Sequence, residues 1–305
     1  MQCRIIANSC STAIALVSGY SDLEANMLKI RHRIPQQDTQ DGDGVKIRRV
    51  ADFRAALLDP FLMVDELRSD DSKDYIGGFP PHPHRGIETF TYIRKGGFEH
   101  RDHLGNREAI REFGTQWMST GSGVLHSEMP LADATKGMHG FQIWVNMAAK
   151  DKFRAPIYQD SNTIANPLVT DAAGNSLRAL AGEWRFNRQT ISAPITDLSA
   201  SARLADVQVL PGQNVELGSF EQGMLGLLVY EGEIAEGEHK NVFLLLESGS
   251  SVSFSASSLG AKVLVFVGEP LKEPVIHYGP FVMNTEQQIH DALRDYQAGA
   301  FGRIE

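Results

Sequence analysis

The sequence predicts an all-β protein made of two barrel-like domains and a short C-terminal helix. A chain of 305 residues exceeds the usual size of a single domain, so two domains are expected. Short runs of alternating apolar and polar residues, separated by glycine and proline turns, fill most of its length. This rhythm is typical of a β-sandwich or of a jelly-roll barrel.

The first β-rich region is predicted to cover residues 39–155. Residues 139–147 alternate cleanly, with Phe141, Ile143 and Val145 on one face, which predicts a strand. The Gly96-Gly97 pair is expected to close a hairpin.

The second β-rich region is predicted to cover residues 156–305 and to end in a helix. Ile289 and Leu293 recur at helical spacing after Asn284 or Thr285, either of which can cap a helix. The apolar runs of strand length cover residues 204–210, 226–231, 242–246 and 262–268.

Residues 1–38 precede the β pattern and are predicted to be a disordered leader or the product of a misassigned start, with Met27 as an internal start. Both cysteines, Cys3 and Cys10, lie in this segment, so no disulfide framework is expected in the core. A reducing, cytoplasmic location follows from that usage. No stretch is long and apolar enough to predict a membrane span.

Composition narrows the classes of partner. Hydrophobic residues make up 42% and charged residues 22% of the chain, as in ordinary folded proteins. The net charge of -9 argues against non-specific binding to nucleic acid or to acidic membranes, which requires clustered cations. We expect a small molecule or a protein as partner, and a monomeric chain.

Two segments, 79–88 and 121–130, carry a candidate metal site. Side chains two residues apart on a strand share a face, so His82 and His84 point the same way, as do His126 and Glu128. Three imidazoles and a carboxylate converge if these strands are neighbours. Such a set suits iron, manganese, copper, nickel or zinc with open coordination positions, and the absence of a thiolate disfavours a closed structural zinc site.

Glu88 is a second candidate for the acidic ligand. Glu88, Phe90 and Tyr92 alternate after the first histidine pair and are expected on the same face. A buried carboxylate beside buried histidines is costly without a partner, and a shared cation would supply one. Strand phase permits either Glu88 or Glu128 as the ligand.

The remaining histidines and aromatic residues have simpler expected roles. His100 and His103, on either side of Asp102, are expected to be solvated turn residues, with a place on the pocket rim as the alternative. His139 and His277 are expected to be core or surface residues with satisfied hydrogen bonds. Four aromatic residues are left unassigned between core and cavity wall: Phe79, Tyr92, Trp117 and Trp144.

The two histidine segments resemble the cupin pattern, in which a His-x-His strand is answered by a later Gly-x-x-His strand. More narrowly, the chain from about residue 40 to its end resembles the pirin family. The segments that carry this resemblance, in family order, are Ile47 to Arg49, Leu58 to Asp65, His82 to Gly86, Gln116 to Gly121, Leu125 to Pro130, Gln142 to Asn146, Glu269 to Val275 and Gly279 to Thr285.

The resemblance to pirins implies two stacked cupin barrels, with the metal in the N-terminal barrel. It implies His82, His84, His126 and Glu128 as ligands, with Fe(II) as the first choice of metal and Mn, Cu, Ni, Co or Zn as alternatives. Glu88 would then hold an imidazole N–H or an ordered water next to the metal. The C-terminal barrel is expected to hold no metal.

Some pirins resemble flavonol dioxygenases, so the family match implies a function. The first hypothesis is a mononuclear metal-dependent dioxygenase, similar to quercetin 2,3-dioxygenase, that opens flavonols with O2 and releases CO, with Glu128 as a candidate base. The alternative is a non-catalytic, iron-dependent redox-sensing regulator that binds a transcription factor or a metabolic enzyme. A sugar or keto-acid isomerase is a weaker third reading, because the fold hosts many chemistries.

Overall fold

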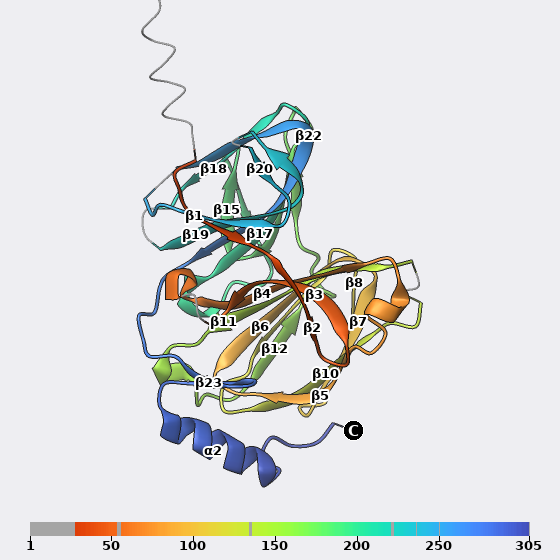
Figure 1. Cartoon of the computed structure of the whole chain (residues 1–305), viewed down its shortest axis with the longest axis vertical. Coiled ribbons are helices and arrows are strands. Elements are labelled where there is room, and N and C mark those ends of the chain that lie inside the picture. The colour runs from red at the N-terminus through yellow and green to blue at the C-terminus, as the bar shows by residue number, and fades with distance from the viewer. Residues whose placement is uncertain are drawn as a thin grey trace, which may run out of the picture.

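The computed structural model describes residues 28–53, 56–133, 136–220, 223–235, 237–249 and 251–304. Figure 1 shows two bodies of β-strands stacked along the long axis, with one α-helix at the lower end. The predicted fold, all-β with two cupin-type barrels and a C-terminal helix, is confirmed.

Residues 37–160 form the N-terminal barrel as a succession of short strands joined by turns. Short 3-10 helices interrupt them at η1 (Ala56–Leu58), η2 (Ser72–Asp74) and η3 (Ala149–Asp151). The strands are β2 (Gln37–Asp41), β3 (Val45–Asp52), β4 (Phe61–Ser69), β5 (Phe79–His84), β6 (Ile87–Lys95), β7 (Gly97–Asp102), β8 (Arg107–Arg111), β9 (Thr115–Ser119), β10 (Val124–Pro130), β11 (Met138–Asn146) and β12 (Ile157–Asp160).

Two antiparallel sheets build this barrel. One has seven strands in the order β12-β9-β6-β11-β4-β3-β2, and the other has four in the order β5-β10-β7-β8. The predicted strand at residues 139–147 is confirmed as β11, in which Phe141, Ile143 and Val145 are buried. The predicted hairpin at Gly96-Gly97 is wrong, because β6 pairs with β9 and β11 whereas β7 pairs with β10 and β8. The turn carries the chain from one sheet to the other.

Residues 168–268 form the C-terminal barrel, whose main sheet has nine strands. This barrel contains η4 (Ser199–Ser201). Its strands are β13 (Leu168–Thr170), β14 (Ser176–Ala181), β15 (Glu183–Phe186), β16 (Gln189–Ser192), β17 (Arg203–Val209), β18 (Asn214–Ser219), β19 (Met224–Ile234), β20 (Glu238–His239), β21 (Val242–Leu246) and β22 (Ser251–Gly268).

The two ends of the described chain cross over between the barrels. Strand β1 (Ile30–Pro35) pairs with β21 of the C-terminal barrel. At the other end, β23 (Ile276–Tyr278), β24 (Phe281–Met283) and α2 (Glu286–Gln297) return to the N-terminal barrel, where Arg85 bonds Asp295 at 2.9 Å. Figure 1 shows β1 in red among the upper strands and α2 in dark blue below the lower barrel.

These crossings depart from the predicted domain limits. Residues 30–35 and 37–38 of the predicted leader are strand, and the last strands and helix of the predicted 156–305 domain pack on the other barrel. Residues 1–27 lie outside the described residues. The predicted helix cap is confirmed at Thr285, whose hydroxyl accepts from Gln288 N while the Gln288 side chain accepts from Thr285 N.

A shared apolar layer joins the barrels, which explains the nearly continuous apolar sequence of β19. Leu227 faces the C-terminal core, whereas Leu228 faces the layer between the barrels. Phe61 of the N-terminal barrel meets Phe266 of the C-terminal barrel edge-on, with ring centroids 5.4 Å apart. Burial of one face of the seven-stranded sheet leaves its other face to line the interior of the N-terminal barrel.

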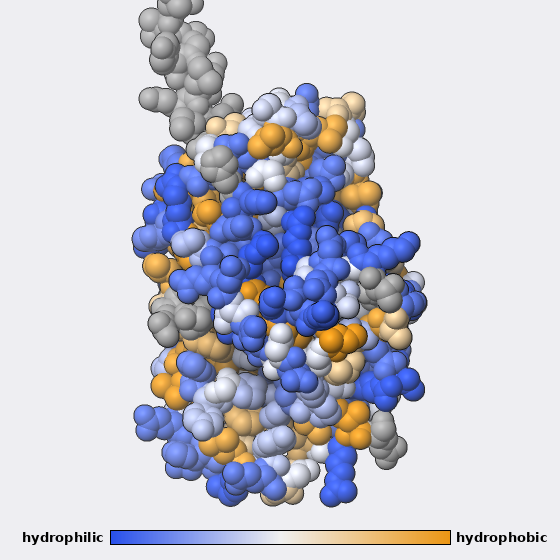
Figure 2. Space-filling view, turned by 45° about the vertical axis from the view of Figure 1, so that its right-hand side comes forward, coloured by the Kyte–Doolittle hydropathy of each residue, from blue (hydrophilic) through white to orange (hydrophobic). Residues whose placement is uncertain are grey.

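The hydrophobic residues on the surface visible in Figure 2 do not form one large patch that would indicate a partner. On the face shown in Figure 2, hydrophobic residues lie in small groups among hydrophilic ones. None of the helices in the described part of the chain has the length and apolar character needed to cross a membrane.

Candidate metal centre

Strand β10 brings the two predicted segments together, because it lies between β5 and β7. His126 on β10 is directly opposite His82 on β5, and Val124 is opposite His84. On the other side, His126 is opposite Asp102 of β7. Directly opposed residues of an antiparallel pair share a face, so the alternation that predicted the cluster holds within these strands.

Three imidazoles meet in this sheet. The ring centroids of His82 and His126 are 4.3 Å apart, those of His82 and His84 4.8 Å, and those of His84 and His126 4.9 Å. One nitrogen of each ring lies within 4.8 Å of one nitrogen of each of the others. The Nε2 atoms of His82 and His126 are 2.9 Å apart.

Burial favours the neutral form of two of these rings, His84 and His126. Burial lowers the pKa of His84 and His126 well below the usual value, and the neighbouring His82 lowers both further. The Nδ1 atom of His82 lies 2.8 Å from the Pro80 carbonyl, which can only accept, so Nδ1 carries the hydrogen and Nε2 presents a lone pair. The Nδ1 atoms of His84 and His126 have no hydrogen-bond partner among the described residues. Nitrogen lone pairs packed together in this way fit a divalent metal.

Glu128 lies in an overlapping group. A carboxylate oxygen of Glu128, one nitrogen of His100 and one nitrogen of His126 lie within 4.8 Å of one another. His126 therefore belongs both to this group and to the group of three imidazoles, but Glu128 is not within 4.8 Å of all three imidazoles. The Glu128 carboxylate accepts from Thr91 Oγ1 at 3.1 Å, from Gln142 Nε2 at 3.4 Å and from the Gln116 amide.

His100 is the site residue that the sequence analysis placed wrongly. It is fully buried, its Nε2 lies 3.0 Å from Asp102 Oδ2, and its ring stacks on Tyr158 at 4.7 Å. Burial raises the pKa of Asp102, but hydrogen bonds from His100 and Asn106 outweigh it and leave the pKa below its usual value. His100 faces the interior because β7 pairs with β10, where it is opposite Glu128. Predicting a strand at residues 97–102 would have placed the His100 side chain on the inner face.

The structure gives Glu88 partners other than an imidazole. Its carboxylate accepts from Arg154 Nη2 at 2.9 Å and from Ser199 Oγ and N, each at 2.8 Å. Burial raises the pKa of Glu88, while the Ser199 and Arg154 contacts oppose that rise. Gly86, with φ of 81°, joins β5 to β6 in the other sheet, so the phase of the histidine pair does not extend to Glu88.

Of the other histidines, His139 is buried and hydrogen-bonded, whereas His277 is exposed and stacks on an aromatic ring. His139 Nε2 lies 3.0 Å from Glu66 Oε1, and His277 stacks on Phe53 with ring centroids 4.2 Å apart. His103, which is half-buried, lies at the turn after β7, where its Nδ1 is 3.3 Å from Leu125 N.

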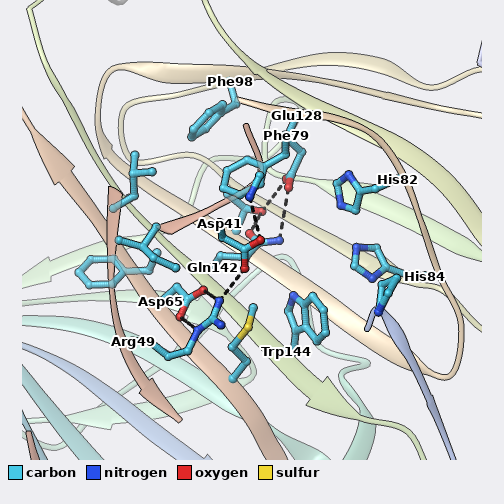
Figure 3. Close-up of a pocket in the computed structure, with 18 of the residues that line it drawn as sticks. Asp41, Arg49, Asp65, Phe79, His82, His84, Phe98, Glu128, Gln142 and Trp144 are labelled. Atoms are coloured by element: carbon cyan, nitrogen blue, oxygen red, sulfur yellow. Dashed lines mark hydrogen bonds and ion pairs between the residues drawn. The ribbon is translucent and has the colours of Figure 1, made fainter. Parts of the chain in front are cut away.

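A cavity of about 680 Å³ opens beside the imidazoles, within the size range of small-molecule sites. Figure 3 shows His82 and His84 on one side of it, with Trp144, Phe79 and Glu128 around them. Tyr92 and Trp117, which could not be assigned from the sequence, pack instead in the apolar layer between the barrels.

Two antiparallel barrels in one chain, the first with a histidine cluster beside an interior cavity, define a two-domain cupin. The pirin family model matches residues 44–145, and the model of the pirin C-terminal cupin domain matches residues 204–302. The chain belongs to the pirin family.

Relatives extend over nearly the whole chain. A Vibrio cholerae protein, provisionally named as a quercetin 2,3-dioxygenase, is 42% identical over 90% of this chain and 97% of its own length. Mouse pirin is 32% identical over 90% and 93%. The crystal structure of an Acinetobacter baumannii quercetin 2,3-dioxygenase has a TM-score of 0.81 at 29% identity, covering 92% of this chain and all of that one.

Proposed function

We propose that this chain is a mononuclear metal-dependent dioxygenase that opens flavonol-like substrates with O2 and releases CO. The observation that carries the proposal is the cluster of three imidazoles at the wall of an aromatic-lined cavity. The names of the Vibrio and Acinetobacter relatives support the same substrate class.

The ligands in this proposal are His82, His84 and His126, with Glu128 as the acidic ligand. Fe(II) is the proposed metal, and Mn, Co, Ni, Cu and Zn are alternatives with the same preference for imidazole and carboxylate. A metal held by these residues would supply a Lewis-acid centre for the oxygenation of the substrate.

Glu128 is also the proposed proton acceptor for the substrate 3-hydroxyl. It lies in the cavity wall, and it is held by Thr91, Gln116 and Gln142. Three donors orient the carboxylate and limit its rotation, which places one oxygen to take a proton. The Gln142 contact, at 3.4 Å, is longer than the Thr91 contact, at 3.1 Å.

The aromatic wall has a separate task. Trp144 and Phe79 line the cavity, and the Phe53 ring meets Trp144 edge-on at 5.7 Å. Flat, rigid side chains bind a flat substrate at low cost in conformational entropy, and they exclude bulk water from the reacting atoms.

The test uses anaerobically purified full-length protein, loaded with Fe(II) and supplied with quercetin. We expect one O2 consumed and one CO released for each flavonol opened, and no turnover with a flavone that lacks the 3-hydroxyl. Full metal loading without O2 uptake, together with a protein partner whose affinity differs between the ferrous and ferric forms, would instead establish the regulatory alternative.

A pair of variants separates the two acidic residues. Glu128→Gln should lower metal content and abolish CO release, whereas Glu88→Gln, whose partners are Arg154 and Ser199, should keep the metal. Metal lost from Glu88→Gln and kept by Glu128→Gln would show that the acidic ligand is assigned to the wrong residue.

The proposal includes a cytoplasmic location and a monomeric chain. Both cysteines lie within the first ten residues, so the barrels rely on packing and hydrogen bonds and not on disulfides. A size measurement in solution and fractionation of the source cells would test the two statements.

A further inference from the structure

The cavity has a second polar group, made of Arg49, Asp65 and Asp41, which we call the distal triad. Arg49 donates from Nε to Asp65 Oδ1 at 2.8 Å and from Nη2 to Asp65 Oδ2 at 2.7 Å. The same Nη2 donates to Asp41 Oδ2 at 2.6 Å. All three residues line the cavity that His82 and His84 also line, and Figure 3 shows them apart from the two histidines.

The distal triad combines one cation with two carboxylates. Asp65 is buried, and burial raises its pKa to about 6 in spite of the Arg49 contact, so it is mostly ionised at pH 7. The Asp41 side chain is 48% exposed. The formal charge of the distal triad is therefore negative by one unit.

The triad keeps hydrogen-bonding capacity that the protein does not use. Arg49 Nη1 has no hydrogen-bond partner among the described residues. The Asp41 carboxylate accepts from its neighbour Gly42 N and from Arg49, which leaves lone pairs for another donor. A ligand group that both donates and accepts would use both.

Several side chains of the same cavity are aromatic or apolar. Phe53 and His277 stack with an interplanar angle of 11°, and Met63, Phe98 and Trp144 also line the cavity. A ligand that reaches from the histidines to the distal triad therefore meets aromatic side chains, which favour a planar, largely apolar middle.

We propose that the distal triad binds a neutral phenolic hydroxyl at the far end of the substrate and rejects a carboxylate or phosphate there. A hydroxyl donates to Asp41 and accepts from Arg49, whereas an anion meets a group of net negative charge in a partly buried site. The substrate class is thus an elongated polyphenol with an uncharged distal ring. This inference deepens the proposed function and rests on its assignment of the histidine end.

The test compares two probes that differ only at the distal ring, 4′-hydroxyflavonol and 4′-carboxyflavonol. Binding to the full-length, zinc-loaded protein is measured without O2 by fluorescence titration, so no turnover is needed. We expect the hydroxyl probe to bind about tenfold more tightly or better, which corresponds to about 1.4 kcal/mol. The ratio cancels the contribution of the histidine end, which both probes share.

Substitutions at Asp41, the exposed residue of the distal triad, should leave the fold intact. Asp41→Asn should reduce the preference several-fold, and Asp41→Lys should reverse it. Asp38→Asn, on the same strand but 92% exposed and outside the cavity, is the matched control and should leave the ratio unchanged.

The inference is overturned if the two probes bind equally, if neither binds, or if Asp41→Asn and Asp38→Asn give the same ratio. A selective ratio in a protein that never consumes O2 would sustain the distal triad and refute the dioxygenase. Turnover of flavonols without selectivity between the two probes would support the dioxygenase and refute the distal triad. The failure of one proposal can therefore be distinguished from the failure of the other.

Discussion

The interiors of the two barrels differ more than their folds do. Strands of the C-terminal barrel enclose a core of aliphatic and aromatic side chains, among them Leu227, Val263 and Phe254. Its buried polar or charged residues, within the described part of residues 168–268, are Asn175, Asp206 and Glu238. The N-terminal barrel buries most of the others and keeps a cavity of about 680 Å³.

This difference shows what a functional interior requires of the fold. An apolar core needs only shape, because its stability comes from burial and close packing. A polar interior must pair its buried carboxylates, and here Glu128, Asp102 and Asp65 each accept hydrogen bonds from neighbouring side chains. The apolar layer and the C-terminal barrel give the polar barrel a rigid support. Changes in the two interiors should therefore alter different properties.

The largest expected effect is on metal binding. His126→Ala removes the residue that the two ligand groups share, so we expect more than about 100-fold loss of metal affinity, beyond the ~10 to 100-fold typical of supporting residues. Elemental analysis of the purified protein measures this. His139→Gln, a buried histidine of the same barrel that bonds Glu66, is the control and should retain one metal per chain.

The second largest effect is on stability and comes from a substitution in the C-terminal core. Leu227→Ala removes a fully buried side chain and should lower the free energy of unfolding by about 2 to 5 kcal/mol. Chemical denaturation measures the loss. The folded variant should hold as much metal as the wild type, and a large loss of metal would contradict the separation of roles between the barrels.

The third effect concerns pH. Because burial raises the pKa of Asp65 from 3.8 to about 6, the folded chain binds a proton more readily than the unfolded chain in that window. This contribution to stability is present below about pH 4 and is lost as the pH rises to about 6. Asp65→Asn removes it, so the wild type should lose stability relative to the variant across that range, by up to a few kcal/mol. Parallel unfolding curves at each pH would show instead that Asp65 titrates normally.

The smallest effect tests the crossing of the C-terminal segment. Thr285→Ala removes the cap of α2 and should cost about 1 kcal/mol. Because Ile289 of α2 and Phe301, which follows the helix, pack in one cluster with Leu125 of the N-terminal barrel, hydrogen exchange should increase in that barrel's partner segments and not in the C-terminal core. Exchange that rises only in the C-terminal barrel would contradict the crossing.

Local pattern was sufficient to predict several features. Alternation predicted β11, the capping signal at Thr285 predicted α2, and the period of two brought His82 and His84 to one face. These predictions succeed because strand and helix periods act over a few residues and do not depend on distant partners.

Tertiary structure decided the features that depend on which strands become neighbours. Gly86 and the Gly96-Gly97 turn move the chain between sheets, which separates Glu88 from the histidines and buries His100 beside Glu128. The pairing of β1 with the far barrel joins segments about two hundred residues apart along the chain. The sequence by itself determined the elements and the residues able to bind a metal. Long-range pairing, which no local period encodes, decided their neighbours and joined the distal triad to the same cavity.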